Sequence, residues 1–214
     1  GVYNGIKAAV KEKMNKTSLS GLRVSVQGLG HVGTHLVDYL SKDGAEIFVT
    51  DIDKGRVDYI IKKYGCQYVD PDHIIKQPVD IYAPCALGAT INKDTVLLLD
   101  CKIVAGAANN VLSNASEDSK ALIKRDILYA PDYVINAGGL INVANELEGY
   151  NRDKAFNNAE KIYDTLMGIF KRAKKDSISN HEAAALQAED RIKKISSLKS
   201  FYLPYKKTFK IRND

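Results

Sequence analysis

Apolar and polar positions along the chain change their period several times, and each change predicts an element. Residues Val2–Met14 space their apolar side chains three or four positions apart, as on one face of a helix. Short apolar runs at residues 22–27 and 46–50 predict buried strands, and residues 31–41 between them have a helical spacing. The chain therefore opens with a helix, followed by a strand–helix–strand unit.

This alternation continues through the first 150 residues. A second internal helix is predicted over residues 53–65, ending at Gly65, and apolar strands recur at DIYAPC (80–85), KIVAGA (102–107) and ILYAPDYVIN (127–136). Strands that are apolar almost throughout, separated by helices, are typical of a parallel sheet covered on both faces. The pattern predicts an α/β fold, a doubly wound parallel sheet of the Rossmann type, with additional C-terminal helices.

Beyond residue 150 the pattern is helical only. Apolar positions from Ala155 to Ala173 predict a long amphipathic helix, and residues 179–195 predict another, with Ser179 or Asn180 as its cap. We expect a Rossmann domain over residues 1–150 and a helical region over residues 151–214 packed on the same domain. The first helix starts at residue 1 without a capping residue ahead of it, so we expect the chain to be a piece of something longer.

Composition excludes several classes of protein. No apolar run approaches the roughly 20 residues of a membrane span, and no signal segment opens the chain. The three cysteines lack metal-type spacing, which favours a reduced, cytoplasmic protein without a metal site. The net charge of +5 is concentrated in KRAKKD and the tail KKTFKIRND, without an aromatic platform or a helix-turn-helix pattern. A solvated basic face is therefore favoured over nucleic-acid binding.

The stretch VQGLGHVG carries the first candidate chemistry. Gly28, Gly30 and Gly33 form G-x-G-x-x-G directly after a predicted strand and at the start of a predicted helix. In that context the glycines permit a tight turn, a bare backbone for a pyrophosphate, and close packing of helix on strand. The N-terminus of the helix adds unpaired N–H groups and partial positive charge. The alternative is a glycine turn without a ligand.

An acid follows at the end of the next predicted strand. Asp51 lies 18 residues after Gly33 (51 − 33), where a carboxylate can accept hydrogen bonds from the adenosine ribose and would repel a 2′-phosphate. This favours NAD over NADP, although the nearby Lys54 and Arg56 leave NADP open. His31, inside the loop, is interpreted as a neutral lining residue rather than a catalytic one.

Three further stretches of small residues follow strand ends, where a doubly wound sheet binds ligands. They are APCALG (83–88), AGAANN (105–110) and YAPDYVINAGGLINVANE (129–146). Any one of them is a plausible strand-to-helix turn, but three together favour a ligand along the sheet edge. Cys85, in the first, has no histidine pairing motif and is interpreted as a soft contact residue rather than a nucleophile. Cys66 and Cys101 are interpreted as core residues.

These motifs, in this order, resemble the amino-acid dehydrogenase family, in particular its leucine, valine and phenylalanine branch. VQGLGHVG, TDID, DIYAPCALG, VAGAANN, LYAPDYVINAGG and GYNR follow that branch from Gly1 to about Tyr202. A different NAD dehydrogenase, sharing only the glycine loop, would not explain AGAANN and INAGG.

The resemblance implies roles residue by residue. Implied cofactor-binding residues are Gly28, Leu29, Gly30, His31, Val32, Gly33, Asp51, Ile52, Cys85, Ala86, Ala107, Ala108 and Asn109. Implied substrate-binding residues are Asn109, Leu140 and Val143, whose apolar members suit a branched or aromatic side chain. Many relatives carry valine where Leu140 stands, so the preferred amino acid stays open.

The implied reaction is reversible oxidative deamination of a branched-chain or aromatic L-amino acid to a 2-oxo acid, ammonia and NADH. The family's catalytic lysine and aspartate belong to a preceding substrate domain, and neither motif occurs here; Asp132 in APDY only mimics the Pro-Asp motif. We therefore expect no catalytic residue in this chain and NAD binding without turnover. The alternative is a non-catalytic NAD-binding module. The full-length protein is expected to be a homo-oligomer acting on a small molecule.

Overall fold

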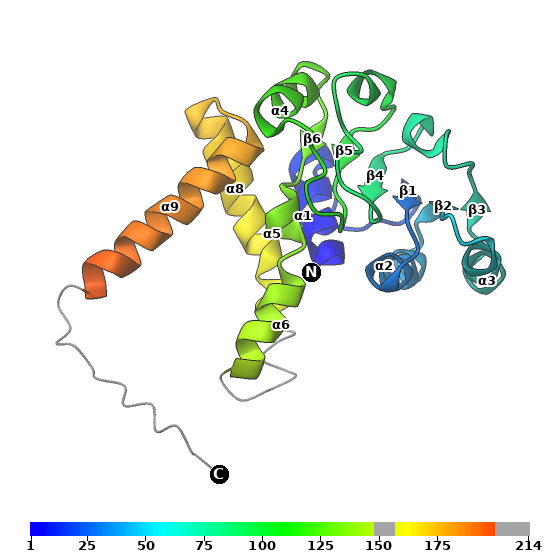
Figure 1. Cartoon of the computed structure of the whole chain (residues 1–214), viewed down its shortest axis with the longest axis horizontal. Helices are drawn as coiled ribbons and strands as arrows, with labels where there is room; N and C mark the ends of the chain where they lie inside the picture. The colour runs from blue at the N-terminus through cyan, green and yellow to red at the C-terminus, as the bar shows by residue number, and fades with distance from the viewer. Residues whose placement is uncertain (148–156, 200–214) are drawn as a thin grey trace, which may run out of the picture.

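The computed structural model describes residues 1–147 and 157–199 of the chain. A six-stranded sheet forms its centre, in the order β3-β2-β1-β4-β5-β6 (Figure 1). The strands are β1 Arg23–Gln27, β2 Glu46–Thr50, β3 Gln67–Tyr68, β4 Ile81–Pro84, β5 Ile103–Val104 and β6 Leu128–Tyr129. Every pairing is parallel, which confirms the predicted doubly wound sheet.

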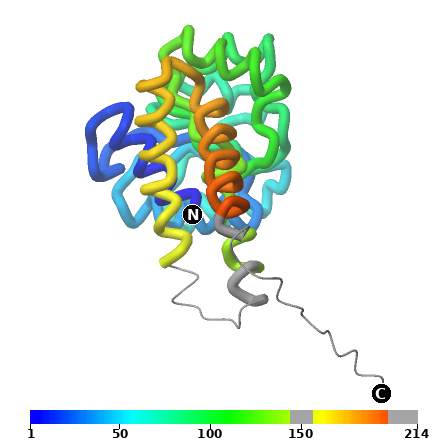
Figure 2. The backbone as a smooth tube through the Cα atoms, turned by 90° about the vertical axis from the view of Figure 1, so that its left-hand side faces the viewer, coloured from blue at the N-terminus to red at the C-terminus, as the bar shows by residue number. Residues whose placement is uncertain are grey.

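Helices cover both faces of this sheet. They are α1 Val2–Met14, α2 His31–Lys42, α3 Lys54–Tyr64, α4 Ala115–Lys124, α5 Asp132–Ile135, α6 Gly138–Leu147, α8 Ile162–Asp176 and α9 Asn180–Lys199, with 3₁₀ turns η1 Ile74–Lys76 and η2 Thr95–Leu98. In Figure 1, α2 and α3 lie on one side of the sheet and α4 on the other. Figure 2 shows α8 and α9 running side by side along one flank.

Successive residues of each strand serve different parts of the core. Val24 and Val26 of β1 are fully buried in the larger apolar cluster, which also contains residues of α1, α2, α3 and α8. Tyr82 and Val104 instead belong to a second cluster with residues of α4. Phe170 of α8 is 1% exposed in the larger cluster, so the helical region shares its core with the sheet domain. This two-sided burial explains why β2, β4 and β5 have apolar residues at successive positions. Strand β1 departs from the predicted pattern, because Arg23, Ser25 and Gln27 alternate with its two valines.

Helix ends follow local chemistry. Asp53 accepts a hydrogen bond from Arg56 N at the start of α3, and Gly65 ends that helix at φ +68°, as predicted. Ser179 Oγ accepts from Glu182 N, so Ser179 is the cap of α9 among the two candidates. The long helix predicted from Ala155 to Ala173 is interrupted: residues 157–160 are helical, Lys161 is a turn, and α8 begins at Ile162. The predicted start at residue 155 lies outside the described residues.

Two predicted strands are wrong in length. The strand predicted over 127–136 ends at Tyr129, because Pro131 lacks an N–H and leads directly into α5. The strand predicted over 102–107 ends at Val104, two residues before Gly106, where a Cβ would lie 2.1 Å from the Pro84 carbonyl oxygen. The hydrophobic pattern also misses β3 and α4. Helix α4 had a usable signal in its N-cap Asn114, which accepts a hydrogen bond from Glu117 N.

Candidate cofactor site at the carboxyl edge of the sheet

The turn from β1 into α2 depends on two glycines. Gly28 has φ +101°, and a Cβ added there would lie 2.7 Å from the Cβ of Ala86 on the neighbouring loop. A Cβ on Gly33 would lie 2.0 Å from the Gly28 carbonyl oxygen. Side chains at either position would force the turn and the first coil of α2 apart. The sequence motif therefore reflects close backbone packing.

Gly30 behaves differently. It caps α2 with φ −64°, and a Cβ added there would meet no other atom within 4 Å. The first N–H groups of α2 have no partner within the helix, and their summed dipoles favour an anion at this end. The open space over Gly30, beside these donors, fits a phosphate group in contact with bare backbone.

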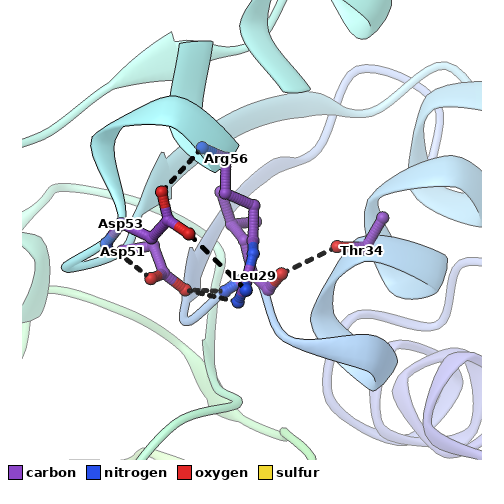
Figure 3. A network of polar contacts seen from close by, with 5 residues as sticks. All are labelled: Leu29, Thr34, Asp51, Asp53 and Arg56. Atoms are coloured by element: carbon purple, nitrogen blue, oxygen red, sulfur yellow. Dashed lines mark hydrogen bonds and ion pairs between the residues drawn. The ribbon is translucent and has the colours of Figure 1, made fainter. Parts of the chain in front are cut away.

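Asp51, directly after β2, connects the glycine loop to the next loop (Figure 3). Its Oδ2 accepts from Leu29 N at 2.5 Å, and its Oδ1 accepts from Asp53 N at 2.9 Å. The side chain is 10% exposed, and it lies at the edge of the cavity described below. The carboxylate thus holds the loop in place and retains acceptor capacity toward a ligand, since two oxygens offer about four lone-pair sites.

Arg56 approaches this carboxylate from the first turn of α3. Its guanidinium nitrogens lie 3.9 Å from Asp51 Oδ2 and 3.6 Å from Asp53 Oδ2, and its side chain is 44% exposed (Figure 3). The two carboxylates therefore balance a cation that also lines the cavity. A 2′-phosphate at this position would meet one favourable and two unfavourable charges.

A cavity of about 540 Å³ opens between the loops after β1, β2 and β4. Its lining residues are Gln27, Gly28, Gly30, Thr50, Asp51, Ile52, Arg56, Pro71, Cys85, Ala86, Leu87, Gly88, Ala89 and Thr90. Strand β1 pairs with both β2 and β4, and the chain leaves these strands in different directions, so the cavity lies at the topological switch point. Six of the sequence-predicted residues line it: Gly28, Gly30, Asp51, Ile52, Cys85 and Ala86.

The other predicted cofactor residues lie beside the cavity. Leu29, Gly33, Ala107 and Ala108 are buried, whereas His31, Val32 and Asn109 are exposed. The loop that carries Asn109 is joined to the cavity wall through Ala89 N, which donates to Asn110 O at 2.7 Å. Asn109 Oδ1 accepts from Asn136 Nδ2 at 3.0 Å, which holds its amide near the start of α6.

The predicted substrate residues of α6 lie apart from this cavity. Leu140 is 74% exposed and Val143 is 53% exposed, and neither belongs to the cavity lining. Two large apolar side chains are thus presented to solvent one turn apart on the helix that follows Gly138 and Gly139.

Several lining residues were not assigned a binding role from the sequence: Gln27, Thr50, Arg56, Pro71, Ala89 and Thr90, together with Leu87 and Gly88, which belong to the predicted ligand stretch APCALG but were not singled out. Gln27 and Thr50 directly precede motif residues, and Leu87 directly follows Ala86, so strand ends adjacent to the motif were the available signal. Pro71 comes from the segment after β3 and had no such signal.

The partly buried Cys85 is poorly suited to act as a nucleophile. Burial raises the pKa of its thiol to about 11, with a hydrogen bond from the Ala107 backbone acting weakly in the opposite sense. A thiol with that pKa is protonated at neutral pH, and the thiolate is the reactive form. Cys66 is 6% exposed in the larger cluster and Cys101 packs against the two smaller clusters, in keeping with their interpretation as core residues.

Asp132 has a structural role. Its side chain is buried, Oδ2 accepts from Val111 N at 2.8 Å, and Oδ1 accepts from Tyr133 N at 2.7 Å. These bonds join the loop after β5 to the start of α5. Both carboxylate oxygens of Asp132 are thus engaged by backbone N–H groups.

No helix within residues 1–147 and 157–199 combines the length and apolar character needed to cross a membrane. Within the same ranges, no group of three or more histidine, cysteine or acidic residues is arranged to hold a metal ion.

The sequence of the chain is similar to one family of known proteins. The sequence profile described as "Glutamate/Leucine/Phenylalanine/Valine dehydrogenase" matches residues 48–198. The chain is also 48% identical to the leucine dehydrogenase of Thermoactinomyces intermedius over 203 residues, 95% of this chain and 55% of that protein. The chain belongs to the glutamate/leucine/phenylalanine/valine dehydrogenase family. It spans about half the length of the curated relatives that it matches.

Solved structures agree with this assignment. The crystal structure of L-tryptophan dehydrogenase from Nostoc punctiforme superposes with a TM-score of 0.89 at 46% identity, covering 92% of this chain and 60% of that one. A hetero-hexameric glutamate dehydrogenase from Thermus thermophilus superposes with a TM-score of 0.70 at 20% identity, covering 94% and 54%. The second likeness is one of fold alone.

Proposed function

We propose that this chain is the NAD-binding part of an amino-acid dehydrogenase, which reversibly deaminates a branched-chain or aromatic L-amino acid to a 2-oxo acid. The observation that carries the proposal is the bond from Leu29 N to Asp51 Oδ2, which joins the glycine loop to a single acid at the edge of the cavity. A dinucleotide needs both parts at once, because its diphosphate and its adenosine ribose are joined covalently.

Each part has a binding role in this proposal. The diphosphate lies over Gly30 at the N-terminus of α2, near His31 and Val32, where helix N–H groups donate to its oxygens. The adenosine ribose hydroxyls donate to Asp51, and Ile52, 96% exposed, contacts the adenosine. Cys85, Ala86, Ala107, Ala108 and Asn109 border the nicotinamide half.

When bound, NAD accepts a hydride from the α-carbon of the substrate. The residues of this chain hold the cofactor and face the substrate; Asn109 reaches toward the amino acid, and Leu140 and Val143 line the pocket for its side chain. The exposure of these two side chains supports a role in contact with a further part of the protein or with substrate. The lysine and aspartate that manage protons lie outside this chain.

Three finer assignments belong to the same proposal. Residues 1–150 are assigned to the dinucleotide domain and residues 151–214 to a helical region packed on it, which the shared core of α1 and α8 supports. Residues 148–156 and 200–214 of these ranges lie outside the described residues. The full-length protein is a homo-oligomer, and the hexameric state named for the Thermus glutamate dehydrogenase supports assembly in the family. The protein acts in the cytoplasm on small molecules.

Calorimetric titration with NAD and NADP tests the cofactor. We expect NAD to bind and NADP to bind at least about tenfold more weakly, because two carboxylates face the 2′ position. Asp51→Ala should weaken NAD about tenfold or more and reduce the preference over NADP. Asp58→Ala, on an exposed position of α3, is the matched control. Equal binding of both dinucleotides, or no NAD binding, would contradict the assignment.

Turnover distinguishes the dehydrogenase from a non-catalytic NAD-binding module. The full-length protein should form NADH from NAD in the presence of leucine, valine, isoleucine or phenylalanine, whereas the 214-residue chain alone should bind NAD without forming NADH. Absence of amino-acid-dependent NADH formation by the full-length protein, with NAD affinity retained, would favour the binding module.

A further inference from the structure

Polar side chains line the sheet beneath the cavity, on the face opposite to Val24 and Val26. Gln27 of β1 pairs in register with Thr50 of β2, and both line the cavity. Thr50 is 2% exposed, and its buried hydroxyl has no hydrogen-bond partner among residues 1–147 and 157–199. Most buried polar groups in proteins are satisfied, so an orphaned hydroxyl in a cavity wall points to a partner supplied by a ligand.

The orientation of the Gln27 amide is held from below. Tyr82 of β4, which is 1% exposed, donates its phenolic hydrogen to Gln27 Oε1. With the oxygen engaged in this way, the amide nitrogen and its two N–H donors are the end left for the cavity, and no described residue accepts from them. Burial raises the pKa of Tyr82 well above its ordinary value, so the phenol remains a donor at any physiological pH.

We propose that Gln27 binds the adenosine half of the dinucleotide through its side-chain amide, with Tyr82 as the residue that positions the amide. This deepens the proposed function and rests on it. Gln27 lies between Thr50 of β2 and Pro84 of β4. The adenosine half is indicated because the neighbour on the β2 side, Thr50, has the orphaned hydroxyl and leads directly into Asp51, the residue proposed to bind the adenosine ribose. An amide N–H in that wall suits an acceptor atom of the purine or its ribose.

The test is a double-substitution cycle on the 214-residue chain, with ADP-ribose as the probe in calorimetry. Gln27→Met removes the amide while keeping the length of the side chain, and should weaken ADP-ribose about fivefold, the value of one net hydrogen bond. Tyr82→Phe should weaken it about threefold in the parent protein and by clearly less in Gln27→Met, since the phenol acts on the ligand mainly through the amide that it holds. Tyr39→Phe, half-exposed on α2, is the matched control.

If Tyr82→Phe does not fold, a second variant and a second probe test the same inference. Gln27→Glu retains the acceptor for Tyr82 but removes the donors, and should weaken ADP-ribose at least about tenfold. AMP, which keeps the adenosine, should lose affinity by the same factor as ADP-ribose in each variant. Unchanged binding in Gln27→Met, an equal Tyr82→Phe effect in both backgrounds, or a loss confined to ADP-ribose would each overturn the inference. A parent protein that binds neither probe would overturn the proposed function, and this inference with it.

Discussion

The polar groups at the amino-terminal ends of the strands (the amino edge of the sheet) differ in their pairing from those at the carboxyl-terminal ends (the carboxyl edge). At the amino edge, charges are paired with one another: Lys102 Nζ lies 2.8 Å from Asp80 Oδ1, and Lys13 Nζ lies 2.6 Å from Asp126 Oδ1. At the carboxyl edge, a helix N-terminus, an orphaned Thr50 hydroxyl and the Gln27 amide face a cavity.

The difference separates stability from binding. At the amino edge the charged side chains form ion pairs with one another when the chain folds, so they contribute to the free energy of unfolding and are not available to a ligand. At the carboxyl ends Asp51 is paired with Arg56, but the buried Thr50 hydroxyl has no partner among the described residues. The parallel order of the strands brings these groups to the same side of the sheet. Substitutions at the two edges should therefore have separable effects on unfolding and on cofactor affinity.

The largest effect is expected where the glycine loop is tightest. Gly33→Ala should lower the free energy of unfolding by roughly 3 kcal/mol and abolish measurable NAD binding, because the new Cβ would lie 2.0 Å from the Gly28 carbonyl oxygen. Denaturant unfolding and calorimetry provide the two readouts.

Gly30→Ala is the matched comparison in the same loop. Its backbone dihedrals suit alanine and its Cβ meets no protein atom, so the free energy of unfolding should change by less than about 0.5 kcal/mol. NAD binding should still weaken about tenfold, because the methyl group occupies the space of a phosphate. If Gly30→Ala bound NAD normally, the diphosphate would not lie over this residue.

At the amino edge, Asp80→Asn should affect unfolding alone. Burial raises the pKa of Asp80, but the ammonium of Lys102 and the N–H of Arg23 outweigh it, so the pKa is lowered overall. A lowered pKa stabilises the fold above the pKa of the unfolded chain, and the gain is lost as pH falls through the folded value.

We therefore expect Asp80→Asn to cost about 1–2 kcal/mol at pH 7. The difference between variant and parent should begin to shrink near about pH 4 and disappear as the pH falls through the lowered pKa of folded Asp80. Urea unfolding at several pH values measures this, with NAD affinity at pH 7 unchanged. A cost that did not shrink toward acid pH would show that the charge of Asp80 is not what stabilises the edge.

The smallest effect is expected for Lys13→Met. Its partner Asp126 is 93% exposed, and ion pairs in water contribute little, so unfolding should change by less than about 0.5 kcal/mol. Thermal unfolding at low and high salt checks this, since the pair should matter least at high salt. A loss of more than about 1 kcal/mol in the free energy of unfolding would mean that solvent does not screen the ion pair between Lys13 and Asp126 in the way that the exposure of Asp126 indicates.

Much of the fold was readable because its signals are local. The helix α2, the strand β2 and the cap at Gly65 follow from apolar spacing and from single residues with strong backbone preferences. The strand predicted through residue 136 was wrong because apolar runs do not distinguish a buried strand from a short buried helix, and Pro131 decided between them.

The sequence by itself determined the glycine turn and the acid that follows it, because these depend on residues close together in the chain. It also determined the family, because the order of several short motifs along the chain is readable without the fold. Only the tertiary structure decided that Asp51 holds the loop through Leu29 N, that Arg56 lies beside it, and that Gln27 and Tyr82 share a hydrogen bond beneath the cavity. Those contacts join different strands, whose register is set by packing of the whole sheet, and no local pattern encodes them.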